Sequence, residues 1–139
     1  MTVQVNEEVA APLGRVWEMV SNFGGIARWH PLVERCESEG QGVGAVRRVF
    51  FRDWHAVELL EVLDAANHVM QYRVTDGSRP ETVNVCGRIA LTQLLNGNTA
   101  IEWSAWIEDD RADKAAMEQF LASNYRTRIG HLRTALGIQ

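Results

Sequence analysis

The feature that most constrains the fold is a run of strands that ends in a single long helix. Residues 45–108 alternate apolar and polar side chains and contain turn signals, such as the hairpin sequence Asn96-Gly97-Asn98. In residues 109–136, apolar side chains recur at helical spacing, with acids gathered at the start and arginines towards the end. One helix covers only part of such a sheet, so we expect a curved sheet with a cavity beneath the helix.

A strand and two short helices are predicted before that run. Residues 2–9 alternate polar and apolar side chains, which indicates a strand. Apolar residues at helical spacing predict a helix over residues 13–23, and a glycine pair ends it. A second short helix is expected over residues 26–29, because Pro31 disfavours helical backbone at the residue before it. This order of elements is typical of a single α+β domain, here residues 1–139.

The composition excludes several classes of protein. With 139 residues, of which 46% are apolar and 23% charged, the chain suits one folded domain and not a disordered segment. A net charge of −4 gives no reason to expect nucleic acid or an anionic membrane as a partner. No apolar run reaches the roughly 20 residues that a membrane span needs, so we expect no membrane insertion.

Signals for targeting, metals and cofactors are missing from the sequence. Residues 1–12 lack the basic start and apolar core of a signal peptide, which predicts a cytoplasmic protein. The four histidines show no HxH or HxxxH spacing, so the sequence predicts no metal site. We expect no cofactor.

Six segments that together cover nearly the whole chain carry a recognisable pattern. They are AAPLGRVWEMVSNFGGIARWHPLV (10–33), GAVRRV (44–49), ELLEVLD (58–64), YRV (72–74), IEWSAWIE (101–108) and IGHLRTAL (129–136). With them the chain resembles the START/Bet v 1-like (SRPBCC) superfamily, and within it the bacterial polyketide cyclase/dehydrase-type branch. The resemblance implies a helix-grip fold, in which a curved antiparallel sheet wraps around the long C-terminal helix and two short helices follow strand 1.

The resemblance also implies two kinds of function. The first is binding of a small hydrophobic molecule, lipid-, polyketide- or aromatic-like, in an internal cavity, as a carrier or sensor. The alternative is a cyclase, dehydratase or lyase that acts on a polyketide-like or aromatic substrate by acid–base catalysis in the same cavity. Because one fold hosts both, the resemblance does not choose between them. The sequence shows no motif for an activated nucleophile, which favours binding.

The residues that face the cavity follow from strand alternation once one residue is fixed. In relatives the acid of the matching strand points inward, which carries over to Glu58, and the predicted hairpin sets Val49 opposite it. The ligand-binding residues predicted on these strands are Arg47, Phe51, Leu60, Tyr72 and Val74. The inward line of the long helix is predicted to include Phe120, Asn124 and Arg128, of which Phe120 and Asn124 are predicted to bind the ligand. The apolar stripe of this helix is predicted to include Met117, Phe120, Leu121, Ile129, Leu132 and Leu136.

The inward face of the last strand has two interpretations. The apolar pattern predicts one set, consisting of Ile101, Trp103, Ala105 and Ile107. Ungapped register with the plant hormone receptors implies the other set, Glu102, Ser104 and Trp106, and a slip of one residue exchanges the two. We favour the second, since Glu102 matches an acid in that branch, and we predict that Glu102 and Trp106 bind the ligand. An outward apolar face would then suit a homodimer contact.

The stretch Trp29-His30-Pro31 joins the second short helix to a strand. In the hormone-receptor branch the position of His30 holds a lysine that reaches the ligand, so the resemblance places His30 at the closed end of the cavity. The alternative is a partly exposed histidine in a helix–strand connection. Acid–base catalysis needs a proton donor and an acceptor, and His30 and Glu58 are the predicted catalytic residues.

Two further positions have open alternatives. The carboxylate of Glu58 can instead form an ion pair with Arg47 that only shapes the cavity wall. Trp54 stands in the turn of residues 52–55, where relatives often place Asp-Gly. Since the family has such turns at the cavity mouth, Trp54 is either a lid or a residue that packs on the surface.

Overall fold

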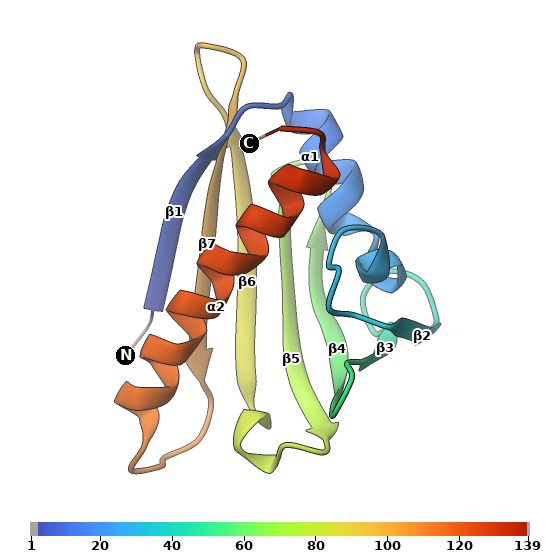
Figure 1. The fold of residues 1–139 in the computed structure, drawn as a ribbon, viewed down its shortest axis with the longest axis vertical. Helices are drawn as coiled ribbons and strands as arrows, with labels where there is room; N and C mark the ends of the chain where they lie inside the picture. The colour runs from blue at the N-terminus through green and yellow to red at the C-terminus, as the bar shows by residue number, and fades with distance from the viewer. Residues whose placement is uncertain (1–2, 139) are drawn as a thin grey trace.

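The computed structural model describes residues 3–138, which form one antiparallel sheet with a long helix across its concave face (Figure 1). The sheet has seven strands in the order β1-β7-β6-β5-β4-β3-β2. The strands are β1 (Val3–Val9), β2 (Arg35–Glu39), β3 (Val46–Phe50), β4 (His55–Asp64), β5 (Val69–Gly77), β6 (Val85–Gln93) and β7 (Thr99–Ile107). The helices are α1 (Leu13–Ser21), the 3-10 helices η1 (Phe23–Arg28) and η2 (Pro80–Thr82), and α2 (Lys114–Ala135). The predicted α+β helix-grip fold is confirmed.

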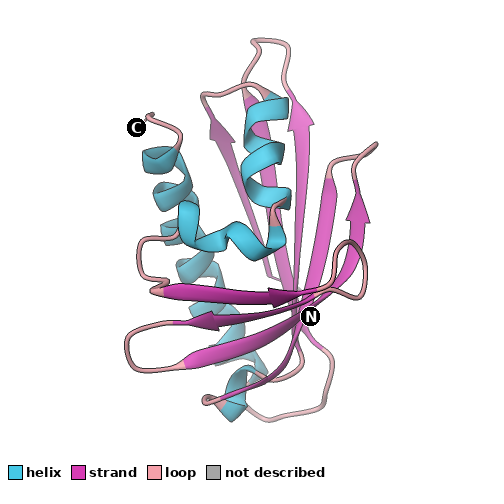
Figure 2. Ribbon diagram, turned by 90° about the vertical axis from the view of Figure 1, so that its right-hand side faces the viewer, coloured by secondary structure: helices cyan, strands magenta, loops and turns pink. Residues whose placement is uncertain are grey.

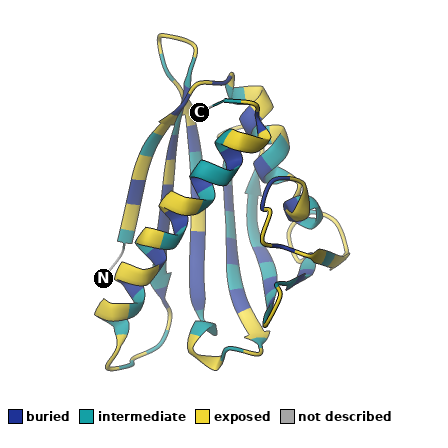
Figure 3. Cartoon of the chain, in the orientation of Figure 1, coloured by how far each residue is buried: buried dark blue, intermediate teal, exposed yellow. Residues whose placement is uncertain are grey.

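The sheet is strongly curved, as the side view in Figure 2 shows, and α2 lies inside the curve. The helix buries a stripe at spacings of three and four residues, which consists of Glu118, Leu121, Tyr125, Ile129 and Leu132. Beneath it the strands are largely buried, whereas the outer face of α2 is exposed (Figure 3). Phe120, predicted within the apolar stripe, is 53% exposed, because it lies one position round the helix from Leu121. Among residues 3–138, no helix combines the length and the apolar character required to cross a membrane.

The glycine pair after α1 has a different role from the predicted one. Gly24 and Gly25 lie inside η1, and α1 already ends at Ser21. A Cβ atom on Gly24 would lie 2.5 Å from Oγ of Ser38, and one on Gly25 would lie 2.5 Å from Nδ2 of Asn22. The pair therefore allows η1 to approach its neighbours closely.

The β3–β4 hairpin is shifted by two residues from the predicted register. Arg47 lies opposite Glu58, and Val49 lies opposite Ala56. The backbone N–H of Phe51 donates to the carbonyl oxygen of Trp54 at 2.8 Å, beyond the end of β3, so the chain reverses at Arg52 and Asp53, one residue earlier than predicted. Since the shift is an even number of residues, the inward and outward faces of both strands stay as predicted.

The favoured prediction for the inward face of β7 is wrong, because it assumed a register that is shifted by one residue. Trp103 is buried against α2, whereas Glu102 is exposed on the outer face and Trp106 is half-buried there. The indole N–H of Trp106 donates to the Glu108 carboxylate at 2.8 Å. Burial of Trp103 removes a large apolar surface from water, and an inward Glu102 would instead bring an unpaired charge inside. The apolar residues of β7 therefore face inward and cannot form the outer contact on which the expectation of a homodimer rested.

Candidate functional site

A cavity of about 50 Å³ lies between α2 and the inner face of the sheet. Its strand wall is formed by Ala56, Glu58, Tyr72, Val74 and Val85. Its helix wall is formed by Met117, Phe120, Leu121, Asn124, Tyr125 and Arg128. The loops β3–β4 and β5–β6, with the short helix η2, border it through Trp54, Arg79 and Thr82. This is the cavity that the curved sheet predicts, although it is small.

Five of the predicted site residues line this cavity: Glu58, Tyr72, Val74, Phe120 and Asn124. Their contact with a ligand stays a prediction. Others do not line it. Leu60 packs in the core with 1% of its surface exposed, Arg47 lies behind Glu58, and Phe51 stands behind Trp54. Glu102 and Trp106 are on the opposite side of the sheet, for the reason given above.

Arg47 and Glu58 form a buried ion pair. Nε of Arg47 donates to Oε1 of Glu58 at 2.7 Å, and the two residues are 4% and 8% exposed. A second nitrogen of the guanidinium, Nη1, donates to the carbonyl oxygen of Phe23 at 2.9 Å, and the group lies over the Phe23 ring. The ion pair predicted as the alternative role of Glu58 is therefore present in the structure. The two hydrogen bonds of Arg47 connect the start of η1 to β3 and hold one oxygen of the Glu58 carboxylate, which faces the cavity.

Two tyrosines meet across the cavity. The hydroxyl of Tyr72 on β5 donates to that of Tyr125 on α2 at 3.5 Å. Burial raises the pKa of Tyr72 and raises that of Tyr125 well above its usual value, so both remain neutral phenols. The Tyr125 ring also stacks on Trp103, with ring centroids 4.4 Å apart. Sequence reasoning missed Tyr125, although it lies four residues from both Leu121 and Ile129 and so continues the helical stripe.

An aromatic stack borders the cavity at the β3–β4 loop. The rings of Phe51 and Trp54 are nearly parallel, with centroids 4.1 Å apart and an interplanar angle of 7°. The guanidinium of Arg79, from the β5–β6 loop, lies 4.2 Å from the centre of the Trp54 ring. Trp54 therefore borders the cavity and links the two loops, which agrees with a lid rather than with packing on the surface alone.

His30 is buried but does not line the cavity. Its side chain lies among aromatic rings, with centroids 5.6 Å from Phe51 and 5.5 Å from His131. Only 3% of its surface is exposed, so the alternative of a partly exposed histidine is wrong. Burial is the main cause that lowers the pKa of His30 to about 3, and repulsion from Arg128 acts in the same direction. The imidazole is thus neutral, and within residues 3–138 its Nδ1 atom has no hydrogen-bond partner.

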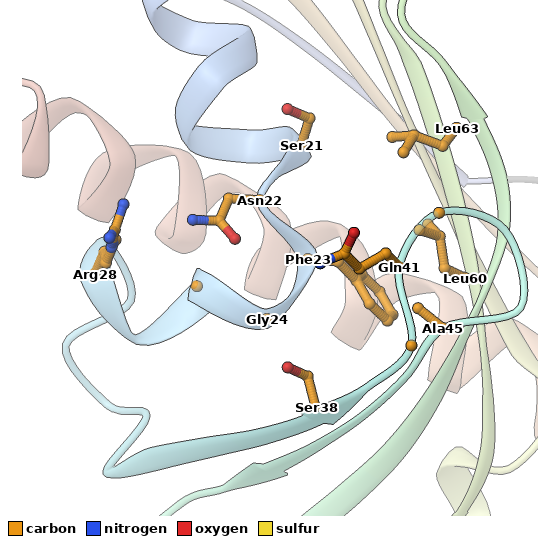
Figure 4. A pocket seen from close by; sticks show the side chains of 13 residues that line it. Ser21, Asn22, Phe23, Gly24, Arg28, Ser38, Gln41, Ala45, Leu60 and Leu63 are labelled. Atoms are coloured by element: carbon orange, nitrogen blue, oxygen red, sulfur yellow. The ribbon is translucent and has the colours of Figure 1, made fainter.

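A larger hollow, of about 540 Å³, lies elsewhere on the molecule (Figure 4). It is bordered by the α1–η1 connection, the loop between β2 and β3, and the side chains of Leu60 and Leu63. The surface of its wall is mostly polar, with side chains such as Ser21, Asn22 and Ser38 and the backbone of several glycines. Such a wall does not suit an apolar ligand, so size alone does not identify the site.

Comparison with known proteins decides the family. Residues 1–137 match the family model described as polyketide cyclase / dehydrase and lipid transport. The chain belongs to this family. The predicted relation to the START/Bet v 1-like superfamily is thereby confirmed. The description of the polyketide cyclase/dehydrase and lipid transport family covers enzymes and carriers alike, so membership does not assign a reaction or a ligand.

Individual relatives agree with this placement in the polyketide cyclase/dehydrase and lipid transport family. The chain is 29% identical over 100 residues to the abscisic acid receptor PYL10 of Arabidopsis thaliana, a match that covers 67% of this chain and 54% of the receptor. It therefore spans about half the length of that relative. XoxI from Bacillus cereus has the same fold, with a TM-score of 0.82 and 18% identity over 96% of this chain and 94% of that one. So has Ara h 8.0201, with a TM-score of 0.80 and 16% identity over 99% and 98% of the two chains.

Proposed function

We propose that this protein binds a small hydrophobic molecule in the cavity beneath α2 and acts as its carrier or sensor. The observation that carries the proposal is an apolar cavity under the gripping helix, with a few polar groups on its wall and an aromatic stack at its border. A mostly apolar cavity with a few convergent polar groups is what binding and orienting such a ligand requires.

The walls divide into an apolar part and a polar part. The apolar part comes from both elements that enclose the cavity and includes Val74, Val85 and Leu121. The polar part includes Glu58 and the tyrosine pair. Apolar contact supplies affinity through the area removed from water, and the polar groups fix the orientation of the ligand.

The size of the cavity implies that the mouth opens when a ligand enters. A volume of about 50 Å³ holds one or two water molecules, which occupy about 30 Å³ each in the liquid. Trp54 and Phe120 both line the cavity, and Phe120 is 53% exposed, so the Phe120 side chain can move without disturbing the core. A relative named as an abscisic acid receptor supports the role of a sensor, and the lipid transport in the family description supports that of a carrier.

Binding of the neutral fluorescent probe N-phenyl-1-naphthylamine tests the proposal. We expect saturable binding, weakened at least about tenfold in Val74→Phe, because the larger side chain occupies the cavity; a loss of about 1.4 kcal/mol in binding free energy corresponds to tenfold. Thr75→Phe is the matched control, since Thr75 is exposed on the outer face of the same strand. Equal affinities in the wild type and Val74→Phe would mean that the probe binds elsewhere. Native mass spectrometry of freshly purified protein would then identify any co-purified ligand.

The alternative is acid–base catalysis of the cyclase, dehydratase or lyase type in the same cavity. One observation supports catalysis: the Glu58 carboxylate and the Tyr72 hydroxyl both line the cavity, which provides a proton acceptor and a neutral donor. Glu58→Gln distinguishes the two functions once a ligand is known. Loss of turnover with binding retained would establish catalysis, and loss of binding without any turnover in the wild type would support the carrier.

A further inference from the structure

Arg128 is a cation on the cavity wall with no acid to balance it. Its side chain comes from α2, lines the cavity and lies beside the Tyr125 ring, 5.8 Å from the ring centre. Among residues 3–138, no carboxylate lies within ion-pair distance of Arg128, and its buried Nε atom has no hydrogen-bond partner. A buried donor without a partner is costly, which suggests that a further group completes this part of the cavity.

The charged groups at the cavity leave an excess of positive charge at Arg128. Glu58 is the one acid that the structure places on the cavity wall, and it already pairs with Arg47 at 2.7 Å. Arg79 is half-buried, and its guanidinium lies over the Trp54 ring at the edge of the cavity. The chain as a whole has 18 acids and 14 bases, so the missing partner of Arg128 does not reflect a lack of acidic residues in the sequence.

We infer that the ligand carries a carboxylate and that Arg128 pairs with it inside the cavity. The inference rests on the proposed function, because it concerns the same cavity. A planar guanidinium binds a carboxylate through two parallel hydrogen bonds, which few other groups match in geometry. Arg128 is then the residue that selects acidic over neutral ligands.

The tyrosine pair adds a hydrogen bond for the same group. The contact between the Tyr72 and Tyr125 hydroxyls uses one of the two phenolic protons, so the other is free for a ligand oxygen. His30 does not compete for this role, because it lies outside the cavity wall behind Phe51 and carries no charge near neutral pH. The acidic end of the ligand therefore lies towards Arg128 and Tyr125, and its apolar body extends towards the mouth.

A matched pair of aromatic probes tests this inference. 2-Naphthoate and 2-naphthalenemethanol share the ring system and differ in the carboxylate, and each is titrated as a competitor of N-phenyl-1-naphthylamine. In the wild type we expect the acid to bind at least about tenfold more tightly than the alcohol, the range expected for hydrogen bonds to a charged group. Arg128→Gln should remove most of this ratio by weakening the acid alone, and Arg128→Lys should keep part of it.

Arg126→Gln is the control, because it removes the same charge from an exposed position on the same helix. Equal binding of acid and alcohol in the wild type would overturn the inference, and so would an equal loss in Arg126→Gln and Arg128→Gln. If N-phenyl-1-naphthylamine and both competitors fail to bind at all, the proposed function fails and this inference with it. If the neutral probes bind and the acid has no advantage, only the inference fails.

Discussion

Arg47 and Glu58 face each other across the β3–β4 pairing, with Nε of the arginine 2.7 Å from Oε1 of the glutamate. Glu58 is on the cavity wall and Arg47 lies behind it, on the same hairpin as Trp54. The arginine also binds the backbone of Phe23 at the start of η1. Arg47 therefore joins the cavity wall to η1, so the shape of the cavity depends on this buried arginine.

Replacing Arg47 by alanine should destabilise the fold strongly, because Glu58 would keep a buried charge without a partner. Breaking a buried pair on one side costs about 3–5 kcal/mol in the free energy of unfolding. Arg48→Ala is the matched control, since Arg48 pairs with Glu39 at 3.2 Å on the exposed face, where a pair contributes about 0–1 kcal/mol. Urea denaturation at pH 7 measures both. Similar losses in the two variants would show that the buried pair has no special role.

Gly87→Ala should disturb Tyr72 and with it the cavity. A Cβ atom on Gly87 would lie 2.4 Å from Cζ and 2.5 Å from the hydroxyl oxygen of Tyr72, so the ring must shift. Overpacking of this kind costs about 1–3 kcal/mol. We also expect weaker binding of N-phenyl-1-naphthylamine.

Gly14→Ala provides the comparison for this change. A Cβ atom on Gly14, in α1, meets nothing within 4 Å, and alanine favours a helix over glycine by up to about 1 kcal/mol. Thermal denaturation should therefore show opposite shifts for the two glycine substitutions. A stabilised Gly87→Ala would mean that the Tyr72 ring is free to move.

His30 should make the stability of the protein depend on pH. Its pKa is about 3 in the folded state and about 6.5 when unfolded. Between these values the unfolded chain binds a proton that the folded protein does not, so the free energy of unfolding falls as the pH drops from about 6.5 towards 3. The slope reaches up to about 1.4 kcal/mol per pH unit.

His30→Gln lacks this group and measures its effect. We expect the loss of stability between pH 7 and pH 5, followed by urea denaturation, to be smaller in the variant than in the wild type. The absolute stability of the variant does not matter for this comparison, because each protein is compared with itself at two pH values. Identical losses would contradict the neutral, buried state of the imidazole.

Trp54→Ala should open the mouth of the cavity. Loss of the stack on Phe51 costs about 1 kcal/mol in stability. Association and dissociation of N-phenyl-1-naphthylamine, followed by stopped-flow fluorescence, should both become faster. Arg52→Ala, an exposed position in the same turn, should leave both rates unchanged. Unaltered rates in Trp54→Ala would show that the ligand enters by another route.

Much of this protein was predictable because its patterns are local. The family resemblance correctly assigned Glu58 to the inner face, and alternation along β5 did so for Tyr72 and Val74. A register error of two residues on the β3–β4 hairpin did not change the inner face. On β7 the apolar pattern gave the right face, and the register borrowed from distant relatives gave the wrong one for Glu102. Burial of apolar side chains was the stronger physical constraint there.

The sequence by itself determined the order of elements, the helix-grip fold and the family, because each follows from periodicity and motifs within short segments. Tertiary structure alone decided what the cavity contains. Tyr125 meets Trp103 and Tyr72, and His30 lies against Phe51 and not in the cavity wall, through contacts between segments far apart in the chain. The size of the cavity, the aromatic stack at its border and the unpaired Arg128 depend on how closely α2 packs on the sheet, which local patterns do not encode.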